Sequence, residues 1–406
     1  MENPTIAFIP SYYKEAKAYS VLPVNGDGDI SFSRSSIATM TNTDGLIQTL
    51  GNNEPRIVKY KDRQDGCSLL LEPFSQNKFE YSEDYSQSEW SKSNCTITEN
   101  DTLAPDGTAS ATLLTTVNPL SFSFLQQQSL SISTKGTISY YCKQSVGDTA
   151  DITAIGSGLD GQAISTYRFL FSTEEITHHA SGDAAISTNV EKLANGWYRI
   201  SVTYACTTIT GARLQVRDGG TDVASLYIWG AQAESNNLSS YIPTSGVPVS
   251  RQSDVAQSTG LGDYIGDGGG TLFVEAAGLP DANTNRGICI SSGSTSDKVL
   301  IRWKSNGTQL QFIVTESGST QVSTTIALTQ TDFNKIAITY ELNNVKMYLN
   351  GALVATDTSM SIFDIGTLDE LEFSEGSTSN RFFGKVEQIK VYDKVLTEDE
   401  AKTLTS

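Results

Sequence analysis

The stretch FNKIAITYELNNVKMYLNG (333–351) decides the fold class of this chain. In its second half, from Val345 to Leu349, every other residue is apolar, which is the two-residue period of a β-strand with one buried face. It then reaches Asn350-Gly351, a pair whose residues tolerate the positive φ that a two-residue hairpin turn requires. A short alternating strand that ends in a tight turn predicts antiparallel β structure.

The same pattern recurs along the 406 residues of the chain. Alternating segments lie at 198–204 and 310–314, and Asp-Gly or Asn-Gly pairs punctuate the sequence throughout. Helix is scarce, and the clearest case is a capping box in which Thr397 caps the first turn while Glu400 reaches back. We therefore predict an all-β protein with two antiparallel β-sandwich or jelly-roll domains preceded by an extended N-terminal segment.

Length and composition suggest where the domains begin and end. A chain of 406 residues is too long for one ordinary core. The polar, glycine-rich stretch 244–269 predicts a linker between a jelly-roll module at 68–243 and a second domain at 270–406, of which 270–404 is expected to fold alone. Residues 1–67 carry too few apolar side chains for a core of their own. We expect them to be an attachment or packing segment that is ordered only against the middle module, another subunit or another protein.

Charge and targeting signals exclude several partners. The net charge of −18, with 28 Lys plus Arg against 46 Asp plus Glu, disfavours binding to a phosphate backbone, so nucleic acid is not expected as a partner. No window is long and apolar enough to cross a bilayer, and the first ten residues lack the features of a secretory signal. The sequence therefore predicts synthesis in the cytoplasm and no membrane partner.

The C-terminal part, about 270–404, resembles the laminin-G or concanavalin-like superfamily. The resemblance is carried by four segments in this order: 333–340, 345–351, the Phe-x-Gly strand 382–392, and the acidic-capped helix start 396–400. It implies a two-sheet jelly roll. It does not choose a function, because this fold is found in lectins, adhesion modules and enzymes alike.

The middle part, about 68–254, resembles the jelly-roll carbohydrate-binding-like modules of bacteriophage tail and head fibres. The segments that carry this resemblance are 68–73, 81–86 with Trp90, 104–109, 196–199, 226–232 and 240–244. It implies a structural or adhesion component of a phage particle (a head or tail fibre or a decoration protein), located in the virion after synthesis in the host bacterial cytoplasm. The implied partners are other virion proteins, bound through the N-terminal segment, a host-surface glycan and further copies of the chain. The alternatives are a glycan-binding, lectin-like receptor protein and a concanavalin-fold glycoside hydrolase.

One run of carboxylates invites a catalytic interpretation. Concanavalin-fold endoglucanases carry a Glu-x-Asp-x-x-Glu strand, and here Glu370, Glu372 and Glu375 stand at that spacing with Glu in place of the central Asp. Alternate strand positions put two carboxyl groups on one face, as a retaining glycosidase requires. With Leu371 and Phe373 facing the core, we expect three exposed glutamates that form no cleft, and hence no catalytic residue and no enzyme.

Binding residues are predicted from side-chain chemistry. An exposed aromatic ring stacks on a sugar face, which makes Trp90, Trp303 and Tyr348 candidates for glycan contacts. No cofactor is expected apart from a structural calcium ion, for which oxygen-rich loops are needed. The candidate ligands are Asp281, Asn283 and Asn285, and the loop 25–29 is a second possibility.

Overall fold

The structure, a computed structural model, describes residues 2–59, 66–216, 223–280 and 284–406. Strands dominate throughout these ranges and all the strand pairs within sheets are antiparallel, so the predicted all-β fold class is confirmed. The chain divides into two compact units. Unit 1 comprises Met1–Ser35, Gly51–Pro73 and Ser253–Ser406, and unit 2 comprises Ser36–Leu50 and Phe74–Gln252.

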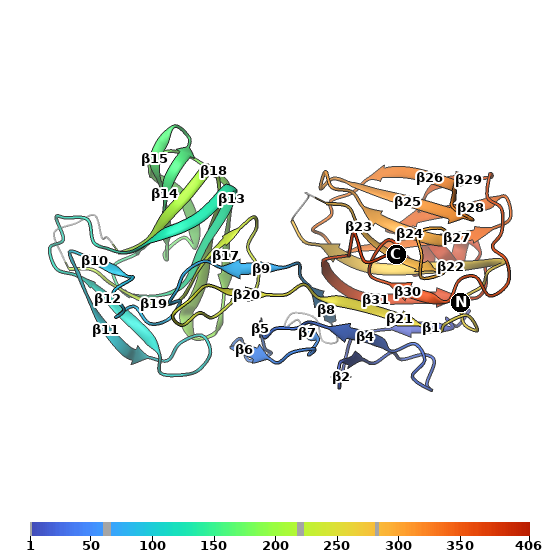
Figure 1. Cartoon of the computed structure of the whole chain (residues 1–406), viewed down its shortest axis with the longest axis horizontal. Helices are drawn as coiled ribbons and strands as arrows, with labels where there is room; N and C mark the ends of the chain where they lie inside the picture. Colours follow the sequence, from blue (N-terminus) through green and yellow to red (C-terminus); the bar gives the residue numbers. More distant parts are fainter. Residues whose placement is uncertain (1, 60–65, 217–222, 281–283) are drawn as a thin grey trace. The chain divides into compact units, whose positions relative to one another are not determined.

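Unit 1 is built on two sheets, visible on the right of Figure 1. Sheet I has the strand order β29 (Ala352–Asp357), β28 (Asn344–Leu349), β27 (Asn334–Glu341), β22 (Gly269–Gly278), β31 (Gly384–Tyr392), β8 (Cys67–Leu71) and β7 (Arg56–Lys59), with β1 (Ile6–Phe8) also paired to β31. Sheet II has the order β2 (Tyr13–Lys14), β3 (Lys17–Ala18), β4 (Ile30–Ser33), β21 (Val255–Thr259), β30 (Glu370–Glu372), β23 (Arg286–Ser291), β24 (Lys298–Trp303), β25 (Gln309–Glu316) and β26 (Ser319–Ala327).

The inner faces of these two sheets enclose the core of unit 1. Ile338 and Val391 from sheet I lie in one apolar cluster with Ile301 and Phe312 from sheet II, and all four are fully buried. The alternation along each strand produces this arrangement, because every second side chain points into the sandwich.

The N-terminal segment belongs to this same core. Strands β1, β7 and β8 extend sheet I, while β2, β3 and β4 extend sheet II, and Ile6, Phe8, Ile30, Phe32 and Leu69 are buried among the C-terminal strands. The expected partners of this segment were the middle module, another subunit or another protein. Ser36–Leu50 does pack with the middle module, in unit 2, whereas the residues up to Ser35 and from Gly51 to Pro73 belong to the C-terminal sandwich and contribute apolar side chains to its core.

The stretch predicted to be a linker is also part of the folded units. Residues 244–269 contain β20 (Val249–Arg251), which pairs with β9 (Ser75–Asn77) in unit 2, and β21, which lies between β4 and β30 in unit 1. The sequence of β21 is polar for a central strand. The side chains on its inner face are the small Ala256 and Ser258, while Gln257 and Thr259 face outward. Composition alone therefore does not predict that this stretch forms a central strand of sheet II.

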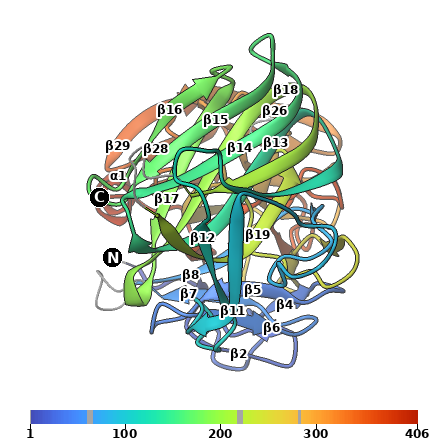
Figure 2. The same cartoon turned by 90° about the vertical axis from the view of Figure 1, so that its left-hand side faces the viewer.

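Unit 2 holds one ten-stranded antiparallel sheet, turned toward the viewer in Figure 2. Its centre is formed by β13 (Phe124–Val146) and β18 (Trp197–Gln215), which pair along most of their length. The other strands are β10 (Ser91–Ser93), β11 (Cys95–Thr102), β12 (Ala111–Thr116), β14 (Thr149–Leu159), β15 (Gln162–Leu170), β16 (Glu175–Ser181), β17 (Ala185–Lys192) and β19 (Ser225–Ser235). The short hairpin of β5 (Ala38–Thr41) and β6 (Ile47–Leu50) also belongs to this unit.

One α-helix occurs in the described part of the chain, α1 (Glu398–Leu404). The predicted capping box is confirmed: the Glu400 backbone N–H donates to the Thr397 side chain, and the Glu400 side chain accepts from the Thr397 backbone. The helix buries Ala401 and Leu404 against the back of sheet I, so sheet I is covered on both faces there. No helix in the described ranges is long and apolar enough to cross a membrane.

A buried ionic network joins the separate segments of unit 1. The Arg34 guanidinium donates to Asp254 over 3.1 Å, and Arg56 bridges Asp254 and Glu72. The side chains of Arg34, Arg56 and Asp254 are fully buried, and that of Glu72 is 5% exposed. Burial disfavours the Arg56 cation, but the two neighbouring carboxylates outweigh this effect, and the pKa of Arg56 is raised.

Removing one member of this network is expected to destabilise unit 1 strongly. Replacing Asp254 with alanine leaves two buried guanidinium groups without their shared carboxylate, which costs about 3–5 kcal/mol in the free energy of unfolding. Urea unfolding followed by circular dichroism measures the change. The control is Lys394→Ala, whose ion pair with Glu2 is exposed (61% and 54%) and is worth less than about 1 kcal/mol. Equal effects of the two substitutions would contradict the role of the network.

The structure also changes the expectation for an isolated C-terminal fragment. Residues 270–404 were expected to fold alone, but β31 would lose β1 and β8, and β30 would lose β21. The fragment would also expose apolar surface that Ile6, Phe8 and Leu69 cover in the full chain. We expect a fragment 270–406 to lack fixed tertiary packing, seen as a weak near-ultraviolet circular dichroism signal, whereas the full chain gives a strong one. A fragment with a native-like near-ultraviolet spectrum would contradict this expectation.

Candidate functional site

The aromatic rings predicted to contact glycans are all inside the protein. Trp90 is 1% exposed and lies between the rings of Phe79 and Tyr85, while Trp303 is fully buried with its ring centroid 4.7 Å from that of Phe382. Tyr348 is fully buried because α1 covers the outer side of β28. A buried ring cannot stack on a sugar, so this prediction is wrong for all three residues.

Of the predicted calcium ligands, Asn285 alone lies within the described residues. Asp281 and Asn283 lie outside the described residues, and the Asn285 carboxamide oxygen accepts from the Ser305 backbone N–H over 3.0 Å. In the second loop, Asn25 and Asp27 bond to each other and to the hydroxyl of Tyr264. Across the ranges that the structure describes, no group of three His, Cys, Asp or Glu residues is arranged to hold a metal ion.

The three glutamates of the 370–375 run have three different environments. Glu372 and Glu375 are 6% and 4% exposed, so the expectation that all three would be exposed is wrong. Glu372 accepts from the Ser291 hydroxyl (2.5 Å) and from the Ser374 hydroxyl (2.7 Å). Glu375 accepts two hydrogen bonds from the Arg302 guanidinium, of 2.6 and 2.5 Å. These two carboxylates were mispredicted because the chain after β30 folds back over the outer face of sheet II.

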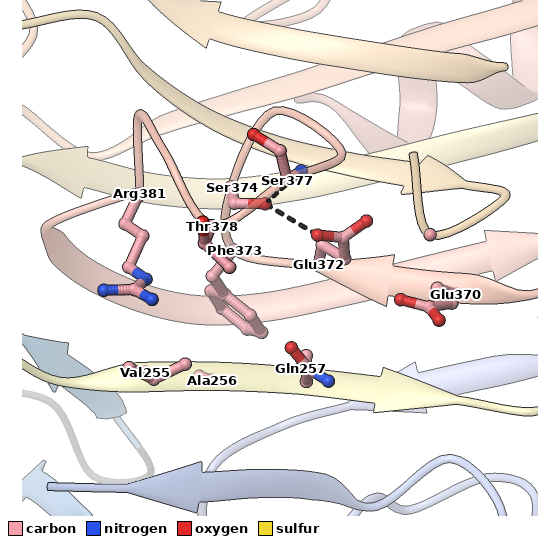
Figure 3. A pocket seen from close by; sticks show the side chains of 11 residues that line it. Val255, Ala256, Gln257, Glu370, Glu372, Phe373, Ser374, Ser377, Thr378 and Arg381 are labelled. Atoms are coloured by element: carbon pink, nitrogen blue, oxygen red, sulfur yellow. Dashed lines mark hydrogen bonds between the residues drawn. The ribbon is translucent and has the colours of Figure 1, made fainter. Parts of the chain in front are cut away.

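Glu370 and Glu372 line a pocket on that outer face, shown in Figure 3. Its volume is about 270 Å³, and it lies where β21, β30 and the segment 373–381 meet. The expectation that these glutamates form no cleft is therefore wrong for Glu370 and Glu372. The complete lining is Val255, Ala256, Gln257, Gly293, Glu370, Glu372, Phe373, Ser374, Ser377, Thr378 and Arg381.

Four side chains of this pocket are free to bind a ligand. Within the described part of the chain, Gln257, Glu370, Thr378 and Arg381 make no side-chain hydrogen bond or ion pair. In Figure 3 the Arg381 guanidinium lies at one end and the Glu370 carboxylate at the other, with the Gln257 amide between them. The pocket thus offers hydrogen-bond donors at one end, an acceptor at the other, and a group of both kinds in the middle.

The local backbone explains how these groups come together. Gln257 and Glu372 are paired residues of β21 and β30, and Glu370 follows on the same face two residues along. Gly293 leaves room beside Glu370, because a Cβ at this position would lie 2.8 Å from a carboxylate oxygen. The position also has a φ of +72°, which favours glycine.

Burial is the main influence on the pKa of Glu370, the pocket carboxylate that makes no hydrogen bond to the described residues. It raises the pKa of Glu370, and the neighbouring charges of Glu372 and Asp369 raise it further. Glu370 therefore ionises less readily than an exposed glutamate, and its neutral form, which can donate a hydrogen bond, persists to a higher pH than in an exposed glutamate.

Sequence reasoning did not identify Gln257, Thr378 and Arg381. Gln257 lies in the stretch predicted to be a linker, and Thr378 and Arg381 lie in a serine-rich loop without a motif. The one available signal was the Glu370–Glu375 run itself, which marked the correct strand. The pairing of β30 with a strand more than 100 residues earlier in the chain could not be read from it.

A second pocket of about 350 Å³ lies in unit 2 and is lined by Glu83, Asp84, Ser86, Glu99, Asn100, Ser110 and Thr112. Its main carboxylates are already engaged. Glu83 accepts from the Tyr241 hydroxyl over 2.7 Å, and Asp84 accepts from Ser86 and Gln87. Burial raises the pKa of Glu83; in Asp84 the effect of burial is outweighed by its hydrogen bonds, which lower the pKa. This pocket offers fewer free groups than the pocket of unit 1.

Comparison with known proteins places part of the chain in a recognised structural class. Residues 274–402 match the family model described as the Concanavalin A-like lectin/glucanases superfamily. This agrees with the resemblance of the C-terminal part to laminin-G and concanavalin-like domains. A comparison with curated proteins gave no match.

Several solved carbohydrate-binding modules and sialidases are similar to the chain. The CBM40 module of Ruminococcus gnavus IT-sialidase bound to α2,3-sialyllactose is 17% identical, covering 35% of this chain and 84% of that module, with a TM-score of 0.29. The NanB sialidase of Streptococcus pneumoniae is 15% identical, covering 35% of this chain and 25% of NanB, with a TM-score of 0.30. Domain 4 of the Geobacillus stearothermophilus arabinanase AbnA, in complex with arabinotriose, is 11% identical, covering 42% of this chain and 83% of that domain, with a TM-score of 0.27. Matches at this level do not identify a ligand for this chain.

The raised pKa of Glu370 predicts a pH-dependent effect of Glu370→Gln. A carboxyl group whose pKa is higher in the folded than in the unfolded state destabilises the fold once it ionises. The variant should therefore be slightly more stable than the wild type at pH 7. The difference should vanish below about pH 4, where Glu370 is protonated in both states. Thermal unfolding across this pH range tests the prediction, with the exposed Glu15→Gln as control. A variant that is less stable at pH 7 would contradict it.

Proposed function

We propose that this protein binds glycans and that the pocket beside β30 is its binding site. The observation that carries the proposal is the set of four unengaged polar side chains, Gln257, Glu370, Thr378 and Arg381, gathered in one pocket. Gln257 and Thr378 are exposed and Glu370 and Arg381 are half-buried, so all four can exchange their contacts with water for hydrogen bonds to a ligand.

Sugar hydroxyl groups match this set of side chains. Each hydroxyl both donates and accepts, so it can bond to an amide, a carboxylate or a guanidinium group. The volume of about 270 Å³ lies just below the range of about 300–1,000 Å³ for small-molecule pockets, which suits a single sugar ring better than a larger ligand. Arg381 adds a charge-assisted donor that also suits the carboxylate of an acidic sugar.

The fold is compatible with this function. The pocket lies on the outer face of a sheet whose strands belong largely to the region matched by the lectin and glucanase superfamily. Such folds carry many functions, so the fold is supporting evidence and the free side chains are the main argument.

We also propose that the protein binds glycans without cleaving them. A retaining glycosidase needs two available carboxyl groups about 5 Å apart. Here Glu372 is held through both oxygens by Ser291 and Ser374, and Glu375 is held by Arg302. Glu370 is the one member of the run with no hydrogen-bond partner in the described structure, which leaves the mechanism without its second carboxylate.

The role in a bacteriophage particle stays a prediction from the sequence. Neither the family match nor the similar structures point to a phage, and they describe lectin-like and carbohydrate-binding folds instead. A mass-spectrometric inventory of purified particles from the source would test it separately from glycan binding.

The binding site is tested with the full-length chain on an array of neutral and acidic mono- to hexasaccharides. Gln257→Ala and Arg381→Ala should each weaken binding to the wild-type hits about tenfold or more, because each removes hydrogen bonds worth about 1.5 kcal/mol. Gln252→Ala removes an exposed amide from unit 2 and serves as the control. Absence of any wild-type hit, or hits unaffected by both pocket substitutions, would overturn the proposal.

A further inference from the structure

The pocket continues into an exposed strip on the outer face of sheet II. In the strand register, Glu372 pairs with Gln257, Gln257 with Ser31, and Ser31 with Lys17. Directly opposed residues point to the same face of a sheet, so this row crosses β30, β21, β4 and β3 on the pocket side. The adjacent row begins with the pair Glu370 and Thr259. Tyr19 lies one residue beyond Ala18, the last residue of β3, and therefore on the same outer side as Lys17.

The far end of this strip carries a pair of exposed aromatic rings. Tyr12 is 60% and Tyr19 is 36% exposed, and their ring centroids are 5.7 Å apart with an interplanar angle of 38°. The Tyr19 backbone N–H donates to the Tyr12 carbonyl, which sets the two residues opposite each other on the hairpin of β2 and β3. Their neighbours Tyr13 and Ala18 form the adjacent pair and face the core, so Tyr12 and Tyr19 face outward with the pocket residues.

The spacing between the pocket and the rings suits a short glycan. Strands lie about 4.8 Å apart, so β3, which Tyr19 directly follows, is three strands, or about 14 Å, from β30, which carries Glu370. The strip between them is polar: Gln257, Thr259 and Ser31 are exposed, and Asp29 is half-buried. A chain of sugars that runs across the strands from the pocket would pass these hydroxyl, amide and carboxylate groups before it reaches the rings.

We infer that Tyr12 and Tyr19 form a second, stacking subsite of the same binding site, so that the protein recognises an oligosaccharide of several units rather than a terminal sugar alone. This inference rests on the proposed glycan-binding function. Aromatic rings bind the apolar faces of sugar rings, and a tyrosine pair offers two such faces at low cost in side-chain entropy. An apolar peptide is not expected as the occupant. It would displace water from the polar groups of the strip without offering them hydrogen bonds in exchange.

This subsite comes from the N-terminal segment, outside the region that matches the lectin and glucanase superfamily. Strands β2 and β3 lie at the end of sheet II beyond β4 and β21. The hairpin thus adds to the family domain a surface that the matched residues 274–402 do not contain.

The test compares chain-length preference in full-length variants on the mono- to hexasaccharide array. The double substitution Tyr12→Ala/Tyr19→Ala should weaken binding of the longer wild-type hits about tenfold or more while it leaves binding of mono- and disaccharides within about twofold. The conservative Tyr12→Phe/Tyr19→Phe keeps the rings and should bind like the wild type. Phe122→Ala, which removes an exposed ring (64%) from unit 2, is the matched control.

The outcomes separate this inference from the proposed function. If the wild type binds longer glycans and the alanine double variant binds them equally well, the tyrosine subsite is overturned while the pocket stands. If the alanine variant loses short and long ligands alike, the rings act through folding of the hairpin, and the subsite is also overturned; thermal unfolding midpoints of the variants confirm that reading. If the wild type binds no glycan on the array, the proposed function fails and the inference fails with it.

Discussion

Four buried charged side chains hold the discontinuous unit 1 together. Arg34 and Arg56 come from two N-terminal pieces of the chain. Glu72 lies next to the end of the second piece, and Asp254 is the second residue of the third piece, which follows the whole of unit 2. The Asp254 backbone N–H also donates to the Glu72 carbonyl, and the Glu72 N–H donates to the Asp254 carboxylate, so the chain leaves unit 1 and returns to it at one point. A buried ionic network gains little stability over a well-packed apolar one, but it tolerates few alternative arrangements. We regard it as the contact that fixes where the returning chain enters sheet II.

That entry point determines the pocket on the outer face of sheet II. Asp254 immediately precedes β21, and β21 fills the position between β4 and β30. With β21 in place, Gln257 lies opposite Glu372 and next to the free carboxylate of Glu370, and the N-terminal hairpin is joined to the same sheet. The pocket and the tyrosine pair therefore depend on one constraint, although their residues come from positions 12 to 381 of the sequence.

Much of the fold was predictable because it depends on local patterns. The alternation from Val345 to Leu349 and the turn at Asn350-Gly351 correctly indicated the hairpin of β28 and β29, and the Thr397–Glu400 capping box is present as predicted. The hairpin of β2 and β3 was not predictable in this way. Its two turn residues, Glu15 and Ala16, have φ values of 51° and 64°, a conformation that side chains other than glycine, asparagine and aspartate seldom adopt. The aromatic candidates failed for a different reason. Whether Trp90, Trp303 and Tyr348 are exposed depends on the core or helix that packs over them, and much of each of these surroundings comes from distant parts of the sequence.

The sequence by itself determined the antiparallel β class, the concanavalin-like character of the C-terminal part and the strand that carries the pocket glutamates, because each follows from residue spacing within a short window. Only the tertiary structure decided that the N-terminal segment completes the C-terminal sandwich, that a polar stretch is the central strand β21, and that two of the three glutamates are buried and engaged. It also decided which polar groups remain free to meet a ligand. The physical reason is that strand pairing and burial depend on contacts between segments far apart in the chain. The free energy that selects these contacts comes from the whole core, so a short stretch of sequence does not predict them.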